Sequence, residues 1–395
     1  MRKCLFCCLL FVIAFHPLLS NGQQSNNSTV KVYYRHLNQN HMTPYIDYEG
    51  RYRISANEAE NVNHYCFTYK NHRLASIEET GTDYSWIMHP LLFIGSKSIK
   101  FTYSPGKRIA RYYDEQGNPA PNYKGVYMEE TLYNKKGQKT NLKYYDYKGH
   151  PMEGVWNISE YQWIYKDSLA IEYRKNLKGD FVDVSPYFPF RISGFCIDLV
   201  QHCITHYDLD KNLHIVNSPE GIAYYEDKEN AEGDQLYWKY YDSLRTMKHP
   251  YGYDRGVNQY DKKGNLERIN FYVGEKLVSY RAFTYDSKGS IKSYLSVWNG
   301  SEQKISSAND ILSFTVPGQV KPSLIDTVSH IIKVYVPEAT DLSYIVPRID
   351  ASQGAFVYPA SNIPVDFTRG NVNYEVIAQN TTYSKVWTVA IEKLK

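Results

Sequence analysis

The chain has few cysteines, and no disulfide framework is expected from them. Three of its six cysteines lie in the apolar start of the chain: Cys4, Cys7 and Cys8. The other three, Cys66, Cys196 and Cys203, are an odd number, which argues against a fold built on disulfides. Cys196 and Cys203 could pair across a hairpin in an oxidising compartment. Two buried thiols are the open alternative.

Charge of either sign is not in excess, because the chain has 45 basic and 42 acidic residues and no basic run. Nucleic-acid binding depends on a basic patch that neutralises phosphates, so we predict no nucleic-acid partner. Several enzyme motifs are absent as well. The sequence contains no His-Glu-x-x-His, no Gly-x-Ser-x-Gly and no phosphate-binding glycine loop.

Three short patterns point to chemistry only weakly. The Ser-Pro-Gly-Lys run from Ser104 fits a Ser-x-x-Lys motif, but Pro-Gly forms a turn where that chemistry needs a helix. Glu129 and Glu130 are adjacent, so on a strand they point to opposite faces and cannot form a glycosidase pair by themselves. His202 and His206 would lie about 13 Å apart on a strand, too far to share one ion. We predict no catalytic residue, no cofactor and no metal.

Long apolar runs are absent after the first residues, which have the pattern of a secretory signal. A basic pair precedes the apolar stretch from Cys4 to Phe15, and small residues lead to a cut expected between Gly22 and Gln23. This stretch is too short to span a membrane, and no later segment is suitable. We therefore predict a secreted, periplasmic or cell-surface protein without a membrane span.

Tyrosine is abundant, with 39 residues, and it opens a short phrase that returns along the chain. In the phrase, tyrosine is followed by Asp or Asn, two polar residues and usually glycine. An Asx side chain can bind the backbone two residues on, and glycine accepts the positive φ that closes such a turn. The phrase therefore predicts β-hairpins joined by type I turns. It reads YDEQGN, YNKKGQ, YDYKGH, YDLDKN, YDKKGN and YDSKGS, from Tyr113, Tyr133, Tyr145, Tyr207, Tyr260 and Tyr285.

The uneven spacing of these phrases predicts a twisted meandering sheet with insertions rather than a regular solenoid. We expect a strand at Val30–Tyr34 and a short helix from the capping box of Ser55 and Glu58 to about His64. An irregular patch at 183–195 is expected either to cover a sheet face or to form a binding lip. The expected fold class is mainly β. The expected units are a signal at 1–22, a lead-in at 23–50, a hairpin-repeat domain at 51–298, a linker at 299–308 and a sandwich domain at 309–395.

Two aromatic clusters are the candidate ligand site. Sugar rings present C–H faces that stack on Trp and Tyr rings, and alternate residues share one face of a strand. The alternative is that one face of each strand packs the core and the other covers a neighbouring strand. The candidate platform residues are Trp156, Tyr161, Trp163, Tyr165, Tyr237, Trp238 and Tyr240.

The last 85 or so residues change character and contain about six short strands rich in Val, Ile and Thr, which predicts a small β-sandwich. We expect these strands at 311–316, 331–336, 342–349, 355–358, 374–378 and 385–391. Successive segments read ILSFTVPGQV, IDTVSHIIKVYVP, DLSYIVPRIDAS, GAFVYPASNIPVDFT, VNYEVIAQN and YSKVWTVAIEK.

This order of segments resembles the immunoglobulin-like domain appended to many secreted or cell-surface bacterial proteins, often in carbohydrate-uptake systems. The resemblance implies an extracellular setting and a spacer or binding role without catalytic residues. The repeat region is similar, more loosely, to Tyr-Asp repeat proteins and to MORN-type repeats.

Together these features predict an exported, non-catalytic binding or adhesion protein of the bacterial envelope. Its partner would be a glycan or an envelope protein, contacted through exposed aromatic residues. Two alternatives remain open from the sequence. One is an extracellular hydrolase whose carboxylates come from distant strands. The other is an immunity-like or structural repeat protein with one dedicated protein partner.

Overall fold

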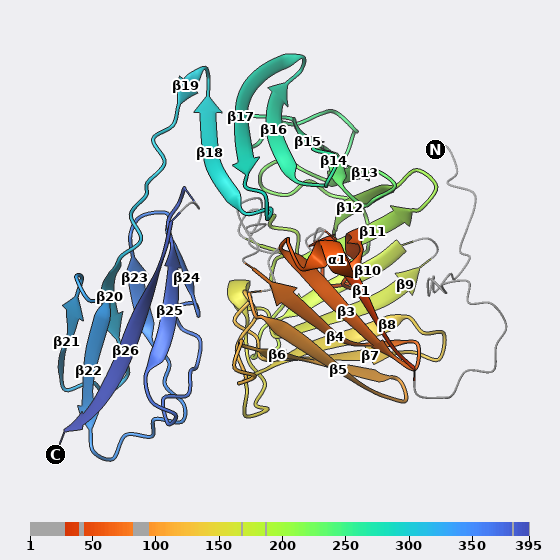
Figure 1. Ribbon diagram of the computed structural model, residues 1–395. Coiled ribbons are helices and arrows are strands. Elements are labelled where there is room, and N and C mark those ends of the chain that lie inside the picture. Colours follow the sequence, from red (N-terminus) through yellow and green to blue (C-terminus); the bar gives the residue numbers. More distant parts are fainter. Residues whose placement is uncertain are drawn as a thin grey trace.

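The structure is a computed structural model that describes residues 28–38, 43–81, 95–166, 169–185, 188–380 and 383–394. The expected signal lies outside the described residues. The described chain is almost entirely β, which confirms the predicted fold class. A large curled sheet lies beside a small sandwich (Figure 1).

Nineteen strands of the described residues form the large sheet. From β3 onward each strand pairs antiparallel with the next along the chain, and β1 lies between β2 and β3. The strands are β1 Thr29–Leu37, β2 Gly50–Ile54, β3 His64–Lys70, β4 Arg73–Thr80, β5 Ser98–Ser104, β6 Lys107–Tyr113, β7 Met128–Tyr133, β8 Lys139–Tyr145, β9 Glu160–Lys166, β10 Leu169–Lys175, β11 Ile192–Asp198, β12 Cys203–Leu209, β13 Tyr224–Glu229, β14 Gln235–Tyr241, β15 Arg255–Tyr260, β16 Leu266–Val273, β17 Lys276–Tyr285, β18 Ile291–Trp298 and β19 Ser301–Glu302. The predicted meander is therefore the architecture of this unit.

The turn chemistry of the repeated phrase is as the sequence predicts. Asp146 accepts the backbone N–H groups of Lys148 and His150 at 2.8 and 2.9 Å, and Gly149 has a φ of 85°. At Tyr133, Tyr260 and Tyr285 the phrase makes a tight hairpin with a register shift beside the tyrosine. At Tyr113 and Tyr145 it instead begins a longer connection to the next strand, since each tyrosine forms a β-bridge six residues on, with Pro119 and Pro151.

One phrase is displaced by two residues from its predicted position. The turn after β12 uses Asp210, which accepts the N–H groups of Asn212 and His214, and not Asp208. Leu213 then occupies the position of the glycine, with a φ of 65°. This left-handed backbone conformation is strained for a residue that has a β-carbon. Among the described residues, four further copies lack part of the signal and were not predicted; their Asx residues are Asn122, Asn176, Asn230 and Asp242.

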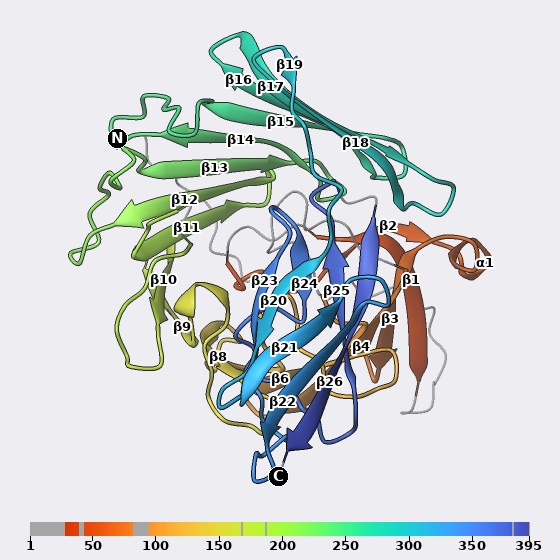
Figure 2. The same ribbon diagram turned by 90° about the vertical axis from the view of Figure 1, so that its left-hand side faces the viewer.

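The sheet curls so that its later turns reach its first strands (Figure 2). Tyr52 of β2 donates to Asp234, in the turn between β13 and β14, at 2.5 Å. The backbone N–H of Asn63 donates to Lys288, in the β17–β18 turn, at 2.9 Å. Gly264 packs against Tyr52, because a β-carbon there would meet the ring at 2.2 Å. Turn contacts of this kind hold the two ends of the sheet together.

The face of the sheet that points inward carries its buried side chains. Across β9 to β12 it is traced by two cross-strand rows, Tyr165–Ala170–Phe195–His206 and Trp163–Glu172–Ser193–Asp208. We call this the concave face, and the opposite one the convex face. Within the patch at 183–195, Phe188 and Phe190 cover part of the concave face, since they are buried in one cluster with Tyr225 and Tyr240.

The predicted helix is shorter than expected. It is α1, Ala56–Ala59, and Ser55 accepts the N–H of Glu58 at 3.2 Å as the capping box requires. One turn is all that forms, because β3 begins at His64.

The sandwich contains β20 Ile311–Thr315, β21 Lys321–Asp326, β22 Ile331–Pro337, β23 Arg348–Ala351, β24 Phe356–Tyr358, β25 Val372–Ile377 and β26 Ser384–Leu394. Strands β20 and β23 form one sheet, and the other five form the second. Its core is built around Phe314, Tyr374 and Trp387. The strand predicted at 342–349 is wrong for most of its length, because 342–347 is a turn with one bridge and only β23 follows. Strand β21 was not predicted.

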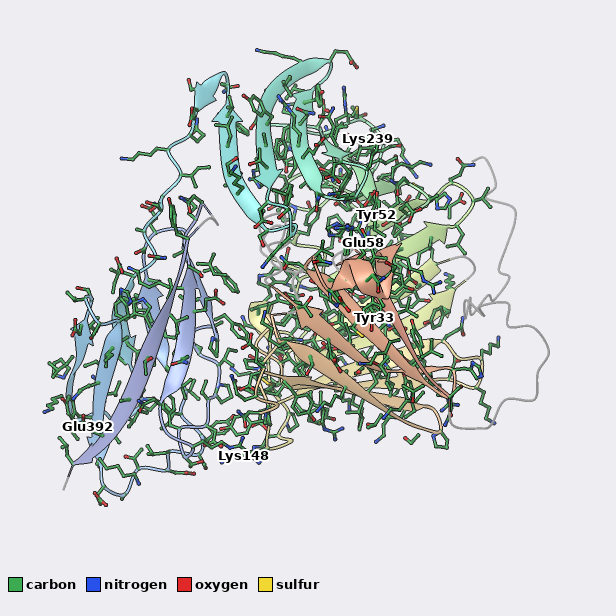
Figure 3. All side chains as sticks on the ribbon, in the orientation of Figure 1. Tyr33, Tyr52, Glu58, Lys148, Lys239 and Glu392 are labelled. Atoms are coloured by element: carbon green, nitrogen blue, oxygen red, sulfur yellow. The ribbon has the colours of Figure 1, made fainter. Side chains whose placement is uncertain are left out.

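The two units share a packed contact. The Tyr127 hydroxyl donates to the carbonyl of Pro364 and the Tyr358 hydroxyl to that of Pro121, both at 2.6 Å. Ile363 of the sandwich is buried in the same cluster as Val126 and Tyr127. Lys148, labelled at this contact in Figure 3, donates to Ser343 at 2.7 Å.

Candidate functional site

The segment at 43–49 lies on the concave face, where it crosses several strands. Lys139 donates to the carbonyls of Pro44 and Tyr45 at 2.9 and 2.7 Å. The Tyr48 hydroxyl is 3.1 Å from that of Tyr112. Asp47 pairs with Arg108 at 2.7 Å and with Lys139 at 2.8 Å. Burial opposes ionisation of Asp47, but these two cations hold the pKa of its carboxyl well below its usual range. Part of the expected lead-in, residues 43–49, is therefore a half-buried element held on the concave face, and we call it the inner segment.

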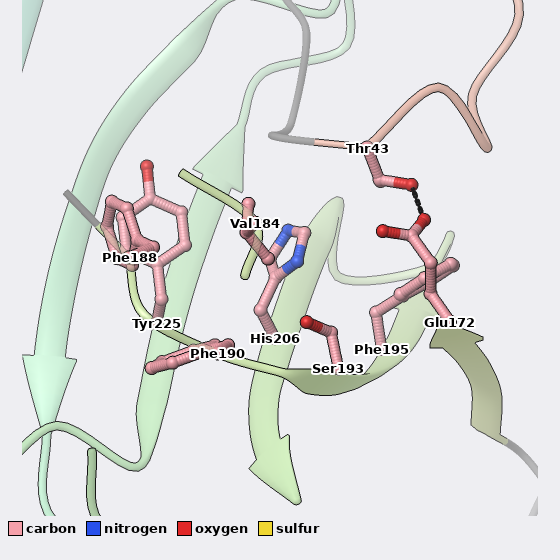
Figure 4. A pocket seen from close by; sticks show the side chains of 9 residues that line it. All are labelled: Thr43, Glu172, Val184, Phe188, Phe190, Ser193, Phe195, His206 and Tyr225. Carbon is pink, nitrogen blue, oxygen red and sulfur yellow. Dashed lines mark hydrogen bonds between the residues drawn. The ribbon is translucent and has the colours of Figure 1, made fainter. Parts of the chain in front are cut away.

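A pocket next to this segment is lined in part by Thr43 and Glu172 (Figure 4), and Glu172 belongs to a buried ionic cluster. Glu172 is fully buried and accepts hydrogen bonds from Thr43, from Trp163 Nε1 at 2.9 Å and from Arg174. Arg174 also donates to Ser193 at 3.0 Å and to the carbonyl of Phe190 at 2.7 Å. The cluster ties β9, β10 and β11 to the inner segment, and its charges are paired as a buried ion pair requires.

This pocket is a poor place for a sugar or for hydrolysis. Its free space is about that of one water molecule. Asp208 lies two strands from Glu172 in the same cross-strand row. Burial raises the pKa of its carboxyl to about 7; Asp183 adds to the rise and Arg174 opposes it. Glu172 is committed to its partners, and both Glu172 and Asp208 are buried.

The structure buries two residues of the first predicted aromatic cluster and half-buries the other two. Tyr161 and Trp163 are 6% and 3% exposed, and their rings stack on each other with centroids 5.9 Å apart. The Tyr165 hydroxyl donates to the carbonyl of Lys139 at 2.7 Å, and Trp156 packs at the edge of the same core. The alternation that suggested a shared face was correct, but that face is the covered one.

The second predicted cluster is divided between the two faces. Tyr240 is 3% exposed, and Trp238 donates to its hydroxyl at 3.1 Å. Tyr237 points to the convex face, where the Lys239 ammonium lies 4.3 Å from its ring centroid. The platform residues are therefore not brought together as one surface, and those that reach solvent in part are Trp156, Tyr165, Tyr237 and Trp238.

Tyrosines of the convex face are commonly covered by a cation. Arg255 lies 4.8 Å from the Tyr272 centroid, and Arg268 lies 3.8 Å from the Tyr280 centroid. A cation over a ring is attracted by its negative face. A ring held in this way does not offer that face to a sugar.

Five aromatic side chains of the described residues are well exposed: Tyr103, Phe181, Trp298, Tyr344 and Tyr383. Three of these rings are covered by a cation. Arg73 lies over Tyr103, Lys175 over Phe181 and Lys148 over Tyr344. Among the described residues, no cation stacks on Trp298 or Tyr383. Sequence reasoning missed Trp298, because it stands alone at the end of its strand and outside any aromatic cluster in the sequence.

Among the described residues, Cys66, Cys196 and Cys203 form no disulfide. Cys196 lies opposite Thr205, and Cys203 lies opposite Asp198, so the two cysteines are diagonal neighbours. Diagonal neighbours on paired strands are about 7–8 Å apart, too far for a disulfide. His202 lies in the turn and His206 on the concave face of β12. The described part of the chain contains no group of three or more His, Cys, Asp or Glu residues that could hold a metal ion.

Comparison with known protein families gives one match, on the sandwich. The model of the family described as "SGBP, N-terminal", of surface glycan-binding proteins, matches residues 311–391. The C-terminal unit is similar to that family. The match starts at β20 and ends within β26, so it covers the segments that carry the immunoglobulin-like resemblance. No curated protein matches the chain.

Two solved structures are similar over parts of the chain. A protein from Bacteroides thetaiotaomicron described as a "putative glycoside hydrolase" is 28% identical, with a TM-score of 0.22. The match covers 24% of this chain and 28% of that one. A porin-like protein from Bacteroides uniformis is 10% identical over 73% of this chain and 92% of its own, with a TM-score of 0.23. Both scores are too low for these likenesses to bear on the site. None of the helices among the described residues has the length and apolar character that a membrane crossing requires.

Proposed function

We propose that this chain is a non-catalytic protein of the bacterial surface that binds a glycan. The observation that carries the proposal is the match of residues 311–391 to surface glycan-binding proteins. The export signal expected at 1–22 agrees with this setting. The curled sheet would act as the rigid body that presents binding side chains, and the sandwich, packed against it through Tyr127 and Ile363, would orient it.

Two features of the site support binding over turnover. The buried acid Glu172 is engaged by Arg174 and Trp163, and the pocket beside it has room for about one water molecule. Retaining and inverting glycosidases need two carboxyl groups about 5 to 10 Å apart around a bound sugar. Flat rings on a rigid sheet, by contrast, suit weak stacking on sugar faces without chemistry.

The proposal is tested by affinity electrophoresis of the exported chain through gels that contain single polysaccharides. A product-release assay on the same polysaccharides runs in parallel. We expect retardation by at least one polysaccharide and no new reducing ends. Reducing ends released in proportion to protein would overturn the non-catalytic assignment. Unretarded migration in every gel, together with one stoichiometric partner recovered from envelope extract, would favour a dedicated protein partner instead.

A further inference from the structure

The far end of the concave face carries an aromatic and cationic group at the edge of the buried cluster of Phe271 and Phe283. Strand β18 places Tyr294, Ser296 and Trp298 on one face by simple alternation, opposite Phe283, Arg281 and Ser279 of β17. Because Phe283 and Ser279 are buried, this is the concave side of the hairpin. The group therefore continues the face that carries Glu172 and Trp163, but beyond the inner segment that fills the other end.

Trp298 is the most exposed tryptophan of the described residues, at 38%. Gly252 lies against one part of its ring, since a β-carbon there would come within 3.1 Å of the indole. Among the described residues, no other aromatic ring stacks on it. Gly252 therefore contacts one part of the Trp298 ring, and the rest of the ring surface is available to a ligand.

Arg281 lies on the strand next to these rings, opposite Ser296, which separates Tyr294 from Trp298 along β18. Its guanidinium lies 5.5 Å from the Phe271 centroid and makes no ion pair with any described residue. Arg255, which covers Tyr272 on the convex face, lies by contrast near the carboxylates of Asp254 and Glu275. An arginine without a carboxylate partner keeps its planar fork of donors available for a carboxylate or for hydroxyl groups.

We propose that Trp298, Tyr294 and Arg281 form the glycan site of this protein and that it prefers sugars bearing carboxylates. The inference rests on the proposed function and adds its location and ligand class. Tyr294 and Trp298 are four residues apart on one strand, about 13 Å, so two rings contact successive parts of one chain. Arg281 then meets an acidic group between them. Phe283 stacks on Tyr294 with centroids 5.1 Å apart and holds that ring upright.

The test uses isothermal titration of the exported chain with polygalacturonate and with hydroxyethyl cellulose, a neutral polysaccharide. Trp298→Ala is expected to weaken binding of polygalacturonate at least tenfold. Arg281→Gln is expected to weaken it and to flatten its dependence on salt. The matched control is Tyr272→Ala, which removes a cation-covered ring from the convex face and should leave affinity unchanged. Unchanged melting temperatures show that the variants fold.

Three outcomes separate the ideas. If the parent chain binds polygalacturonate and the Trp298→Ala variant binds it equally well, the proposed site is wrong. The proposed function is then unaffected. Tighter binding of the neutral polysaccharide than of polygalacturonate overturns the preference for acidic sugars. Absence of any polysaccharide binding by the parent chain overturns the proposed function together with the site.

Discussion

Trp163 donates its indole N–H to the carboxylate of Glu172, its direct cross-strand neighbour, at 2.9 Å. The pair shows how this sheet uses its aromatic residues. The ring of Trp163 packs the interior and its polar edge satisfies a buried charge. Aromatic residues whose sequence pattern suggests a sugar-binding platform can therefore pack the core instead, when a buried carboxylate lies opposite them on the adjacent strand.

The first prediction concerns this pair. Trp163→Ala should lower the free energy of unfolding by about 3–5 kcal/mol, because it leaves a cavity and a weakened Glu172 network. Trp163→Phe should cost about 1–3 kcal/mol, since the ring remains but one hydrogen bond to a buried charge is lost. The control Tyr237→Ala, on the convex face, should cost about 1 kcal/mol or less. Urea denaturation measures all three, and similar losses for Trp163→Ala and Tyr237→Ala would contradict the assignment.

The second prediction concerns the turns that close the sheet. Gly137 and Gly264 have similar positive φ angles, 78° and 81°, but a β-carbon at Gly137 meets nothing within 4 Å. Gly137→Ala should cost about 1 kcal/mol through backbone strain alone. Gly264→Ala must also displace Tyr52 from Asp234, which should add about 1–3 kcal/mol. Equal losses in urea denaturation would show that this turn does not pack on β2.

The third prediction is a pH dependence centred on Asp208. The pKa of this carboxyl is about 7 in the folded chain, against 3.8 for an unperturbed Asp. Between these values the folded state keeps a proton that the unfolded chain has released, so stability falls as pH rises from about 4 to 7. Asp208→Asn should remove this fall and stabilise the chain at pH 8 by about 1–4 kcal/mol. A stability difference between variant and parent that is the same at pH 4 and pH 8 would rule out this role.

The fourth prediction concerns Asp47, whose pKa is depressed. Its stabilising effect is present above the pKa of the unfolded chain and is lost as the pH falls towards that of the folded state. Asp47→Asn should therefore destabilise the chain at pH 7, by about 1 kcal/mol or less because the carboxylate is partly screened by solvent. The loss should shrink at pH 3. Hydrogen exchange in residues 43–49 reports the same change locally, and protection unaffected by the substitution would contradict the anchoring role of Asp47.

Much of the fold could be predicted from the sequence because its turns are local. Each turn is determined by an Asx side chain, by the backbone next to it and by a nearby glycine, as at Asp146 and Gly149. The displaced turn at Asp210 was missed since Tyr207-Asp208 copies the signal two residues too early and Leu213 replaces the glycine. Asp208 itself is a concave-face residue, which only the register with Ser193 reveals.

The site was less predictable because it depends on contacts between distant residues. Whether Tyr161 and Trp163 were exposed depended on the inner segment, whose Thr43 meets Glu172 from 129 positions away. Nothing local to Trp163 marks that cover. Likewise, Trp298 gains its significance from Arg281 and Gly252, which lie on other elements.

The central claim is that the chain binds a polysaccharide and leaves it intact, and one measurement tests it most directly. Titration of the purified chain with a soluble polysaccharide, followed by size-exclusion analysis of that polysaccharide, reports binding and cleavage on the same sample. The account predicts saturable heat and an unchanged polysaccharide size. Saturable heat with shortened polysaccharide, or no heat with any glycan, would contradict it.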